Sequence, residues 1–245
     1  EEVSDGYYTF TITEDTKVVA YFEEEQPEPT PTYTVTVKLN DPAAGEVKGA
    51  GVYEEGEWVA LEAIANDGWE FVSWTFNGEV SSDTYYETAF QITEDVEVLA
   101  TFQKLTYDVG VVYTPEYGTV TGAGTYEYGD SVTLVATPND GYEFLSWWDG
   151  LSEYTDSVYQ FVVTNDVQLE ANFALKQYTL SVEVEGKGSV SVDGVESGDC
   201  VFEHGSYVSL VANPDEGWRF VKWMINGEEV SDGYYTFTIT EDTKV

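Results

Sequence analysis

The chain has 245 residues, of which 42% are hydrophobic and 16% aromatic, and its 47 Asp and Glu against 9 Lys and Arg give a net charge of −38. Nucleic acids and anionic lipids are bound through Lys and Arg, so this charge excludes nucleic acid and anionic membrane surfaces as partners. No apolar run approaches the roughly 18 residues that span a bilayer, and a single cysteine, Cys200, rules out an intrachain disulfide.

The first predicted element is the tail of a preceding repeat, residues 1–22. Its residues 1–18, EEVSDGYYTFTITEDTKV, repeat residues 228–245 letter for letter. This identity, at an offset of 227 residues, predicts a longer natural protein in which a unit of that length recurs. A duplication introduced by engineering is the alternative. Residues 23–32, EEEQPEPTPT, then form an acidic, Pro-rich linker that we expect to be extended.

Three predicted modules of about 70 residues follow the linker, at residues 33–102, 107–173 and 178–245. Each carries one copy of a Gly-aromatic-x-Phe-(Val/Leu)-x-Trp motif: GWEFVSW (68–74), GYEFLSW (141–147) and GWRFVKW (217–223). Self-similarity at a fixed period is typical of repeat proteins. Compared with the first two modules, the third is predicted to lack its final strand, which residues 10–22 contain in complete form.

Short strands and tight turns are predicted throughout the modules. Opening segments such as YTVTV (33–37) alternate apolar and polar residues with the period of a half-buried strand. Asn-Gly at 77–78 and 226–227 and Asp-Gly at 149–150 predict hairpins, and no segment has a helical stripe. We therefore predict an all-β fold, a tandem array of small β-grasp-like or sandwich-like modules. The expected core residues are Trp74, Trp147, Trp223, Phe71, Phe144 and Phe220.

The order of these motifs resembles the divergent internalin-type B-repeat family, the Listeria–Bacteroides repeat domains. ATPNDGYEFLSW (136–147) carries the likeness most strongly, whereas the first module has IAND (64–67) in place of the usual Pro before the turn. The resemblance implies small all-β modules arrayed on bacterial surface or secreted proteins, in a spacer or adhesive role. It brings no catalytic residues to this chain.

Residue types that often carry catalysis have structural explanations here. His204 lies at a variable turn position, which we expect to be solvated, and no nucleophile and acid accompany it in the sequence. Cys200 is an incidental small residue with no cation nearby to lower its pKa. Carboxylate pairs flank a recurrent turn: Asp67 and Glu70, Asp140 and Glu143, Asp215 and Glu216. We predict no enzyme activity, no cofactor and no metal site.

Two tryptophans do not recur between modules and are the candidate ligand-binding residues. Trp58 and Trp148 each neighbour a recurring core position, so strand alternation turns them outward. An exposed indole can stack on a sugar ring or anchor a protein partner. Packing against the next module is the structural alternative.

The predicted function is a non-enzymatic part of a bacterial cell-surface or secreted protein, located extracellularly, that acts as a stalk, fibre or adhesin spacer. Neighbouring copies are the expected partners, end to end, because residues 17–22 (KVVAYF) match the strand expected to be absent from the third module. The alternative is a module that binds a glycan or a host protein. Calcium binding and adaptation to high salt remain open explanations of the acidic surface, although no Asp-rich calcium loop occurs.

Overall fold

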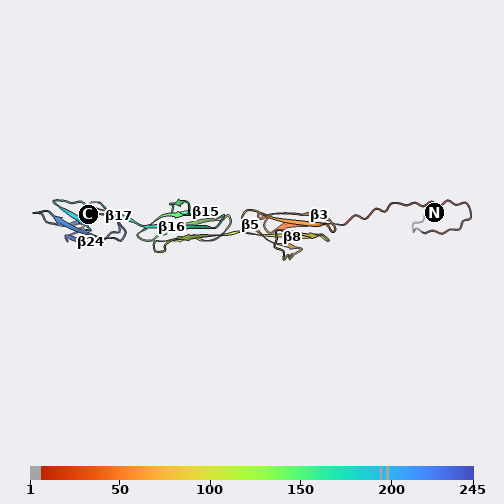
Figure 1. Ribbon diagram of the computed structural model, residues 1–245, viewed down its shortest axis with the longest axis horizontal. Coiled ribbons are helices and arrows are strands. Elements are labelled where there is room, and N and C mark those ends of the chain that lie inside the picture. Colours follow the sequence, from red (N-terminus) through yellow and green to blue (C-terminus); the bar gives the residue numbers. More distant parts are fainter. Residues whose placement is uncertain (1–6, 194, 197–198) are drawn as a thin grey trace.

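Alternating apolar and polar residues build two β-sheets in each of the first two modules and three in the third, and the modules follow one another in a line (Figure 1). The computed structural model describes residues 7–193, 195–196 and 199–245. Among these there is no helix, which confirms the predicted all-β fold. Residues 7–31 contain no strand and extend from the far end of the first module, away from the third (Figure 1).

The first two modules have the same eight strands in the same order. Those of the first are β1 (Thr32–Leu39), β2 (Gly45–Lys48), β3 (Gly51–Glu54), β4 (Trp58–Ala65), β5 (Trp69–Phe76), β6 (Glu79–Val80), β7 (Glu87–Gln91) and β8 (Val96–Lys104). Those of the second are β9 (Thr106–Val112), β10 (Gly118–Thr121), β11 (Gly124–Glu127), β12 (Ser131–Pro138), β13 (Tyr142–Trp148), β14 (Glu153–Tyr154), β15 (Val158–Val162) and β16 (Val167–Leu175).

The described residues of the third module form nine strands, several of them shorter than their counterparts in the other modules. They are β17 (Gln177–Ser181), β18 (Gly188–Val192), β19 (Val195–Glu196), β20 (Cys200–Glu203), β21 (Tyr207–Pro214), β22 (Trp223–Ile225), β23 (Glu228–Val230), β24 (Tyr234–Thr238) and β25 (Thr243–Lys244). The sequence predicted that this module has no final strand. The structure corrects this in part, because the first two residues of that strand are present as β25.

Each of the first two modules is a two-layered sandwich. In the first, a five-stranded sheet, β3-β1-β8-β5-β6, packs against a three-stranded sheet, β2-β4-β7, and the second repeats this as β11-β9-β16-β13-β14 and β10-β12-β15. The last strand of each module lies at the centre of its five-stranded sheet. It pairs in parallel with the opening strand and antiparallel with the strand of the aromatic motif. Of the two predicted architectures, the sandwich-like one matches these layers.

The predicted aromatic residues form the core of each module. Trp74 and Trp147 are completely buried, Trp223 is nearly so, and the motif phenylalanines pack against the same clusters. Each indole N–H donates to a backbone carbonyl, for example from Trp147 to Asp156 at 3.0 Å. A β-bulge after Phe71 lets Phe71 and Trp74, three positions apart, face the same core with ring centroids 5.0 Å apart.

The hairpin turns follow the predicted signals. Asn77 and Gly78 both have positive φ, 48° and 86°, and connect the paired residues Phe76 and Glu79. Both central residues of a type I′ turn require positive φ, which Asn and Gly tolerate best. The Asn-Gly pair at 226–227 has the same conformation.

Candidate functional site

Neighbouring modules are joined through single residues that are bonded on both sides. Leu105 alone lies between β8 and β9. Its amide donates to the carbonyl of Gly68 in the first module (2.8 Å), and its carbonyl accepts from the amide of Tyr128 in the second (2.9 Å). The connecting residue is therefore hydrogen-bonded to both modules.

The second joint has the same geometry. Lys176 alone lies between β16 and β17. Its amide donates to Gly141 (2.9 Å), and its carbonyl accepts from the amide of His204 (2.8 Å). A one-residue connection with both backbone groups bonded leaves adjacent modules little freedom to rotate, because a rotation would break bonds at the joint.

An aromatic ring also closes each joint. A Cβ atom built on Gly68 would lie 2.0 Å from Cδ1 of Tyr128, and one on Gly141 would lie 2.2 Å from Cδ2 of His204. Both glycines have positive φ, 77° and 79°. Each of these positions therefore requires glycine for two reasons: its backbone has positive φ, and the ring approaches too closely for a Cβ atom.

The first joint has an additional charged contact. Nζ of Lys104 lies 3.2 Å from a carboxylate oxygen of Glu127 in the next module and 5.9 Å from the ring centroid of Trp69. Both charged side chains are about half exposed, so the ion pair contributes roughly 0–1 kcal/mol. At the second joint, Leu175 takes the position of Lys104, so this contact has no counterpart there.

His204 is a joint residue, which corrects the expectation of a solvated turn residue. Its ring is half-buried between Gly141 and Tyr178, with the His204 and Tyr178 centroids 5.9 Å apart. Its Nδ1 is buried, and within the described part of the chain this atom has no hydrogen-bond partner. Sequence reasoning missed Tyr128 and His204 as joint residues because the position seemed variable. The sequence did contain one signal: this position carries an aromatic ring in both of the modules that directly follow another module.

The linker enters the first module differently. Glu55, the counterpart of Tyr128 and His204, donates from its amide to the carbonyl of Pro31 (2.8 Å). Phe22 and Tyr33 are eleven positions apart, whereas the equivalent Phe102 and Tyr107 are five apart. Residues 7–31 form no strand and are exposed. The rod therefore has two tight joints and one long, solvated connection.

A cavity of about 620 Å³ opens in the third module. We call it the β17–β22 slot; it lies along residues 183–190 and 212–227 and ends at Lys244 and Val245. Here the five-stranded sheet of the other modules is divided into a three-stranded sheet, β20-β17-β25, and a two-stranded one, β22-β23. Residues 218–222 form no strand, although the equivalent residues of β5 and β13 do. In this module β25 has two residues, whereas β8 and β16 each have nine.

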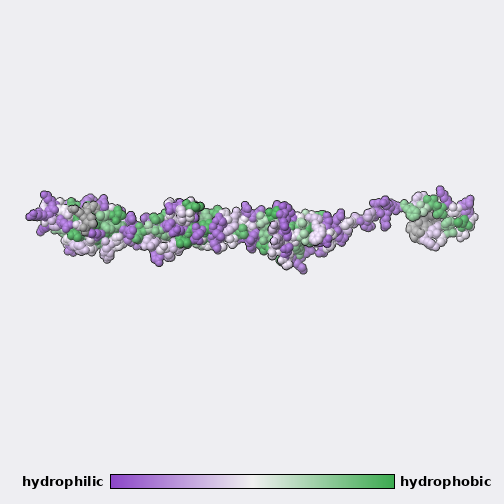
Figure 2. All heavy atoms as spheres, in the orientation of Figure 1, coloured by the Kyte–Doolittle hydropathy of each residue, from purple (hydrophilic) through white to green (hydrophobic). Residues whose placement is uncertain are grey.

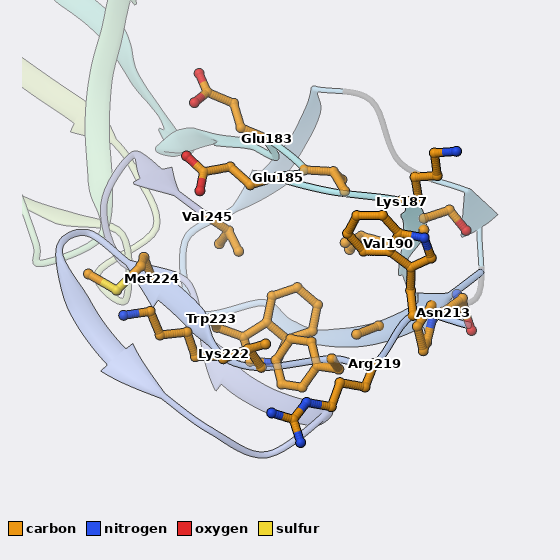
Figure 3. Close-up of a pocket in the computed structure, with 18 of the residues that line it drawn as sticks. Glu183, Glu185, Lys187, Val190, Asn213, Arg219, Lys222, Trp223, Met224 and Val245 are labelled. Carbon is orange, nitrogen blue, oxygen red and sulfur yellow. The ribbon is translucent and has the colours of Figure 1, made fainter. Parts of the chain in front are cut away.

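Apolar, basic and acidic side chains line this slot. Trp223 and Val245 lie beside the open space, with Glu183 and Glu185 on one side and Arg219 and Lys222 on the other (Figure 3). Four of the nine basic residues of the chain line it: Lys187, Arg219, Lys222 and Lys244. Elsewhere, hydrophilic side chains cover much of the three modules and the linker (Figure 2). The slot thus combines an apolar floor with positive charge on a strongly acidic protein.

The two candidate tryptophans lie at the surface but not together. Trp58 is 66% exposed on β4, opposite Gln91 of β7, and Trp148 is 36% exposed on β13, opposite Glu170 of β16. They belong to different sheets of different modules. Each therefore offers a separate stacking surface and not half of a shared site.

The turn after Trp148 is built around one carboxylate. Asp149 accepts hydrogen bonds from the amides of Ser152 (2.7 Å) and Leu151 (2.8 Å), which lower its pKa below the usual value. The hydroxyl of Tyr154 donates to the same carboxylate (3.0 Å). Hydrogen bonding with Tyr159, and then with Asp149, raises the pKa of Tyr154 to about 12. This network is exposed and holds the shape of the β13–β14 hairpin.

The remaining sequence candidates are not gathered into a site. Cys200 begins β20, opposite Leu180 of β17. Within the described ranges, no three His, Cys, Asp or Glu side chains come together to hold a metal ion. The same residues include no helix that is long and apolar enough to cross a bilayer.

Comparison with known proteins identifies the modules. The divergent InlB B-repeat domain matches residues 34–106, 109–177 and 178–245. The chain belongs to this family. Its B-repeats are of a kind typical of bacterial surface proteins, and the family is not a known enzyme family.

Two further likenesses are more distant. The B-repeat chain is 28% identical over 162 residues to a protein of Evansella cellulosilytica named "Putative membrane protein", covering 64% of this chain and 23% of that protein. It thus spans about a quarter of that relative's length. The Bacillus anthracis TIE protein superposes with a TM-score of 0.41 and 9% identity, over 89% of this chain and 50% of that one. A structural likeness at this level carries no argument about function.

Proposed function

We propose that this chain is a stiff spacer within a bacterial surface protein, part of a stalk or fibre that holds other parts of that protein away from the cell. The observation that supports this most directly is the construction of the two joints. Each module is tied to the next through one residue, two backbone hydrogen bonds and one ring on a glycine. Nearest-neighbour contacts of this kind are sufficient to build a long array.

The acidic surface fits the same role. Self-repulsion at a net charge of −38 keeps neighbouring stalks apart and soluble. The Pro-rich linker before the first module supplies an extended connection between stiff sets of three modules. An adhesin spacer would combine these properties with a binding head elsewhere in the protein.

Stiffness is tested by the distance between spin labels on the first and third modules. Val52→Cys on β3 and Val201→Cys on β20 are equivalent exposed sites, introduced together with Cys200→Ser. The two labels are two module lengths apart. This distance is on the order of 60 Å, because a strand of about ten residues spans roughly 30 Å. We expect one narrow distance distribution. A distribution as broad as that of a flexible linker would contradict the proposal.

The variants Tyr128→Ala and His204→Ala, each in the labelled protein, test the cause of the stiffness. Loss of either ring should broaden the distribution because the contact across its joint is lost. Glu55→Ala is the matched control, since Glu55 has the equivalent position but faces the linker. Broadening by the control to the same extent would exclude the joints as the cause.

A second candidate function is binding through Trp58 and Trp148, and their exposure favours it. The Trp58→Ala and Trp148→Ala double variant should lose binding to glycans or to host cells if these indoles are the contact, because each would stack on a ligand. Binding that persists in the double variant would exclude these two indoles as the contact and leave the spacer role as the better supported of the two functions.

A further inference from the structure

We propose that β15 of the second module pairs, edge to edge, with β15 of a second copy of this chain. β15 is the outer strand of the sheet β10-β12-β15, so only one of its two edges has a neighbour among the described strands. The second module lies between two others and has the same two sheets as the first. Its open edge is therefore a property of the folded module. This inference does not depend on the spacer role.

The backbone of β15 bonds to β12 through alternate residues. The carbonyl of Ser157 accepts from the amide of Ala136 (2.9 Å), so Ser157 and every second residue after it bond to β12. The residues between them turn their N–H and C=O groups to the open edge. These are Val158, Gln160 and Val162. The edge thus offers a regular row of donors and acceptors to another strand.

The sequence of β15, VYQFV, has nearly the same pattern in either direction. An antiparallel pair of identical strands centred on Gln160 places Val158 opposite Val162 of the other copy, and Tyr159 opposite Phe161. Gln160 meets its own counterpart. In this register the residues with free backbone groups lie opposite one another, so each such pair exchanges both of its N–H···O bonds. The edge is therefore complementary to itself, as a two-fold contact requires.

Charge favours this edge over the rest of the module surface. Residues 157–165 contain no Asp, Glu, Lys or Arg, and neither does any strand of the sheet β10-β12-β15. Each of the five strands of the other sheet carries an acidic residue. Repulsion therefore opposes contact between the acidic faces of two copies. Pairing through β15 places no like charges opposite one another, an arrangement that would destabilise a sheet.

The side chains at this edge leave it unprotected. Natural proteins block open edges with charges, prolines or bulges, and VYQFV has no charge and no proline. Val158 and Val162 are 48% and 55% exposed. In the first module, Glu87 takes the place of Val158 on the equivalent strand β7, so that edge carries charge. The equivalent strand of the third module, β24, is also uncharged, which makes it the alternative site for such pairing.

Pairing centred on Gln160 joins the three-stranded sheets of two copies into one. The strands run along the rod, so the two rods lie antiparallel (Figure 1). A strand edge of five residues is much smaller than the about 800 Å² per partner of a stable interface, so a single contact is weak. Stalks anchored on one surface point the same way, and an antiparallel contact therefore suits chains from two facing surfaces. This last consequence alone rests on the spacer role.

Sedimentation of the full chain tests the proposal. We expect an equilibrium between one copy and two, with more pairs in 1 M than in 0.15 M NaCl, because salt screens the repulsion between acidic rods. Gln160→Pro removes the amide at the centre of the contact and should weaken pairing by at least about tenfold. Proline is tolerated at an edge position whose N–H faces solvent, so the module should keep its fold, which thermal unfolding checks.

The same substitution at the equivalent edge positions of the other modules provides matched controls. Ala89→Pro on β7 and Thr236→Pro on β24 impose the same backbone change. We expect both to leave pairing unchanged. Weakening by Thr236→Pro but not by Gln160→Pro would place the contact at β24, and equal weakening by all three would show an unspecific effect. Either result, or a chain that stays monomeric at both salt concentrations, would overturn the proposal.

Cysteine cross-linking tests the register. Gln160→Cys, with Cys200→Ser, places one cysteine opposite its own counterpart, with Cα atoms about 5.5 Å apart and within reach of a disulfide. This chain should form a disulfide-linked pair with itself. Val158→Cys should not, because it lies about 13 Å from its counterpart, but it should link to a chain with Val162→Cys. Equal self-linking by Gln160→Cys and Val158→Cys would contradict the pairing.

Discussion

The ring of Tyr128 lies against the backbone of Gly68 so closely that a Cβ atom on Gly68 would come within 2.0 Å of Cδ1 of the ring. Tyr128 belongs to the second module and Gly68 to the first. The same relationship, between His204 and Gly141, closes the second joint. The equivalent residue of the third module is Gly217. A Cβ atom added there would have no described residue within 4 Å apart from its chain neighbours.

These three glycines allow a matched comparison of joint contact with backbone strain. Gly68→Ala and Gly217→Ala both place a Cβ on a residue of positive φ, 77° and 81°, at a cost of about 1–2 kcal/mol each. Gly68→Ala also pushes the ring of Tyr128 away, so it alone should broaden the label distances between modules. Thermal unfolding measures the strain shared by both variants. Equal distance distributions in the two variants would contradict a closed joint.

A second prediction concerns the buried Nδ1 of His204. Since no described residue bonds this atom, its burial is uncompensated, and a polar group in that state costs about 1–3 kcal/mol. His204→Phe keeps a ring against Gly141 and removes the polar atom, so it should raise the melting temperature. His204→Ala, which also removes the ring, is the comparison and should lower it. A drop in stability for His204→Phe would indicate that the nitrogen is in fact satisfied.

The buried indole N–H of the core tryptophans gives a third prediction. Trp147→Phe keeps an aromatic ring but leaves the carbonyl of Asp156 without its donor, so the free energy of unfolding should fall by about 2–3 kcal/mol. Trp148→Phe, at the next and more exposed position, should change it by less than about 0.5 kcal/mol. Denaturant unfolding measures both, and similar losses would argue against the hydrogen bond as the cause.

The turn after Trp148 should be sensitive to acid. The amides of Ser152 and Leu151 lower the pKa of Asp149 from its ordinary value of 3.8. A carboxyl group whose folded pKa is depressed stabilises the fold at pH values above its unfolded pKa. This stabilisation is lost as the pH falls through the folded pKa. The β13–β14 hairpin should therefore loosen below about pH 4, visible in the fluorescence of Trp148. Asp149→Asn removes this titration, and an unchanged acid transition in that variant would show that other carboxylates cause it.

Much of each module could be predicted from its own sequence. Apolar and polar alternation, Asn-Gly turns and the recurring Trp predicted the strands, two hairpins and the buried core, because these signals act between residues close in sequence. The outward orientation of Trp58 and Trp148 followed from the same alternation. Whether either indole binds a ligand stays a prediction.

What the tertiary structure decided involves residues from different strands or modules. No sequence spacing indicates that Tyr128 packs on Gly68, or that a bulge turns Phe71 and Trp74 to one face, because both depend on how separate segments approach. The β17–β22 slot is of the same kind. That Arg219 and Trp223 line one cavity became visible only when the strands were placed in space. Local periodicity determines which residues form strands, and packing determines which of those strands become neighbours.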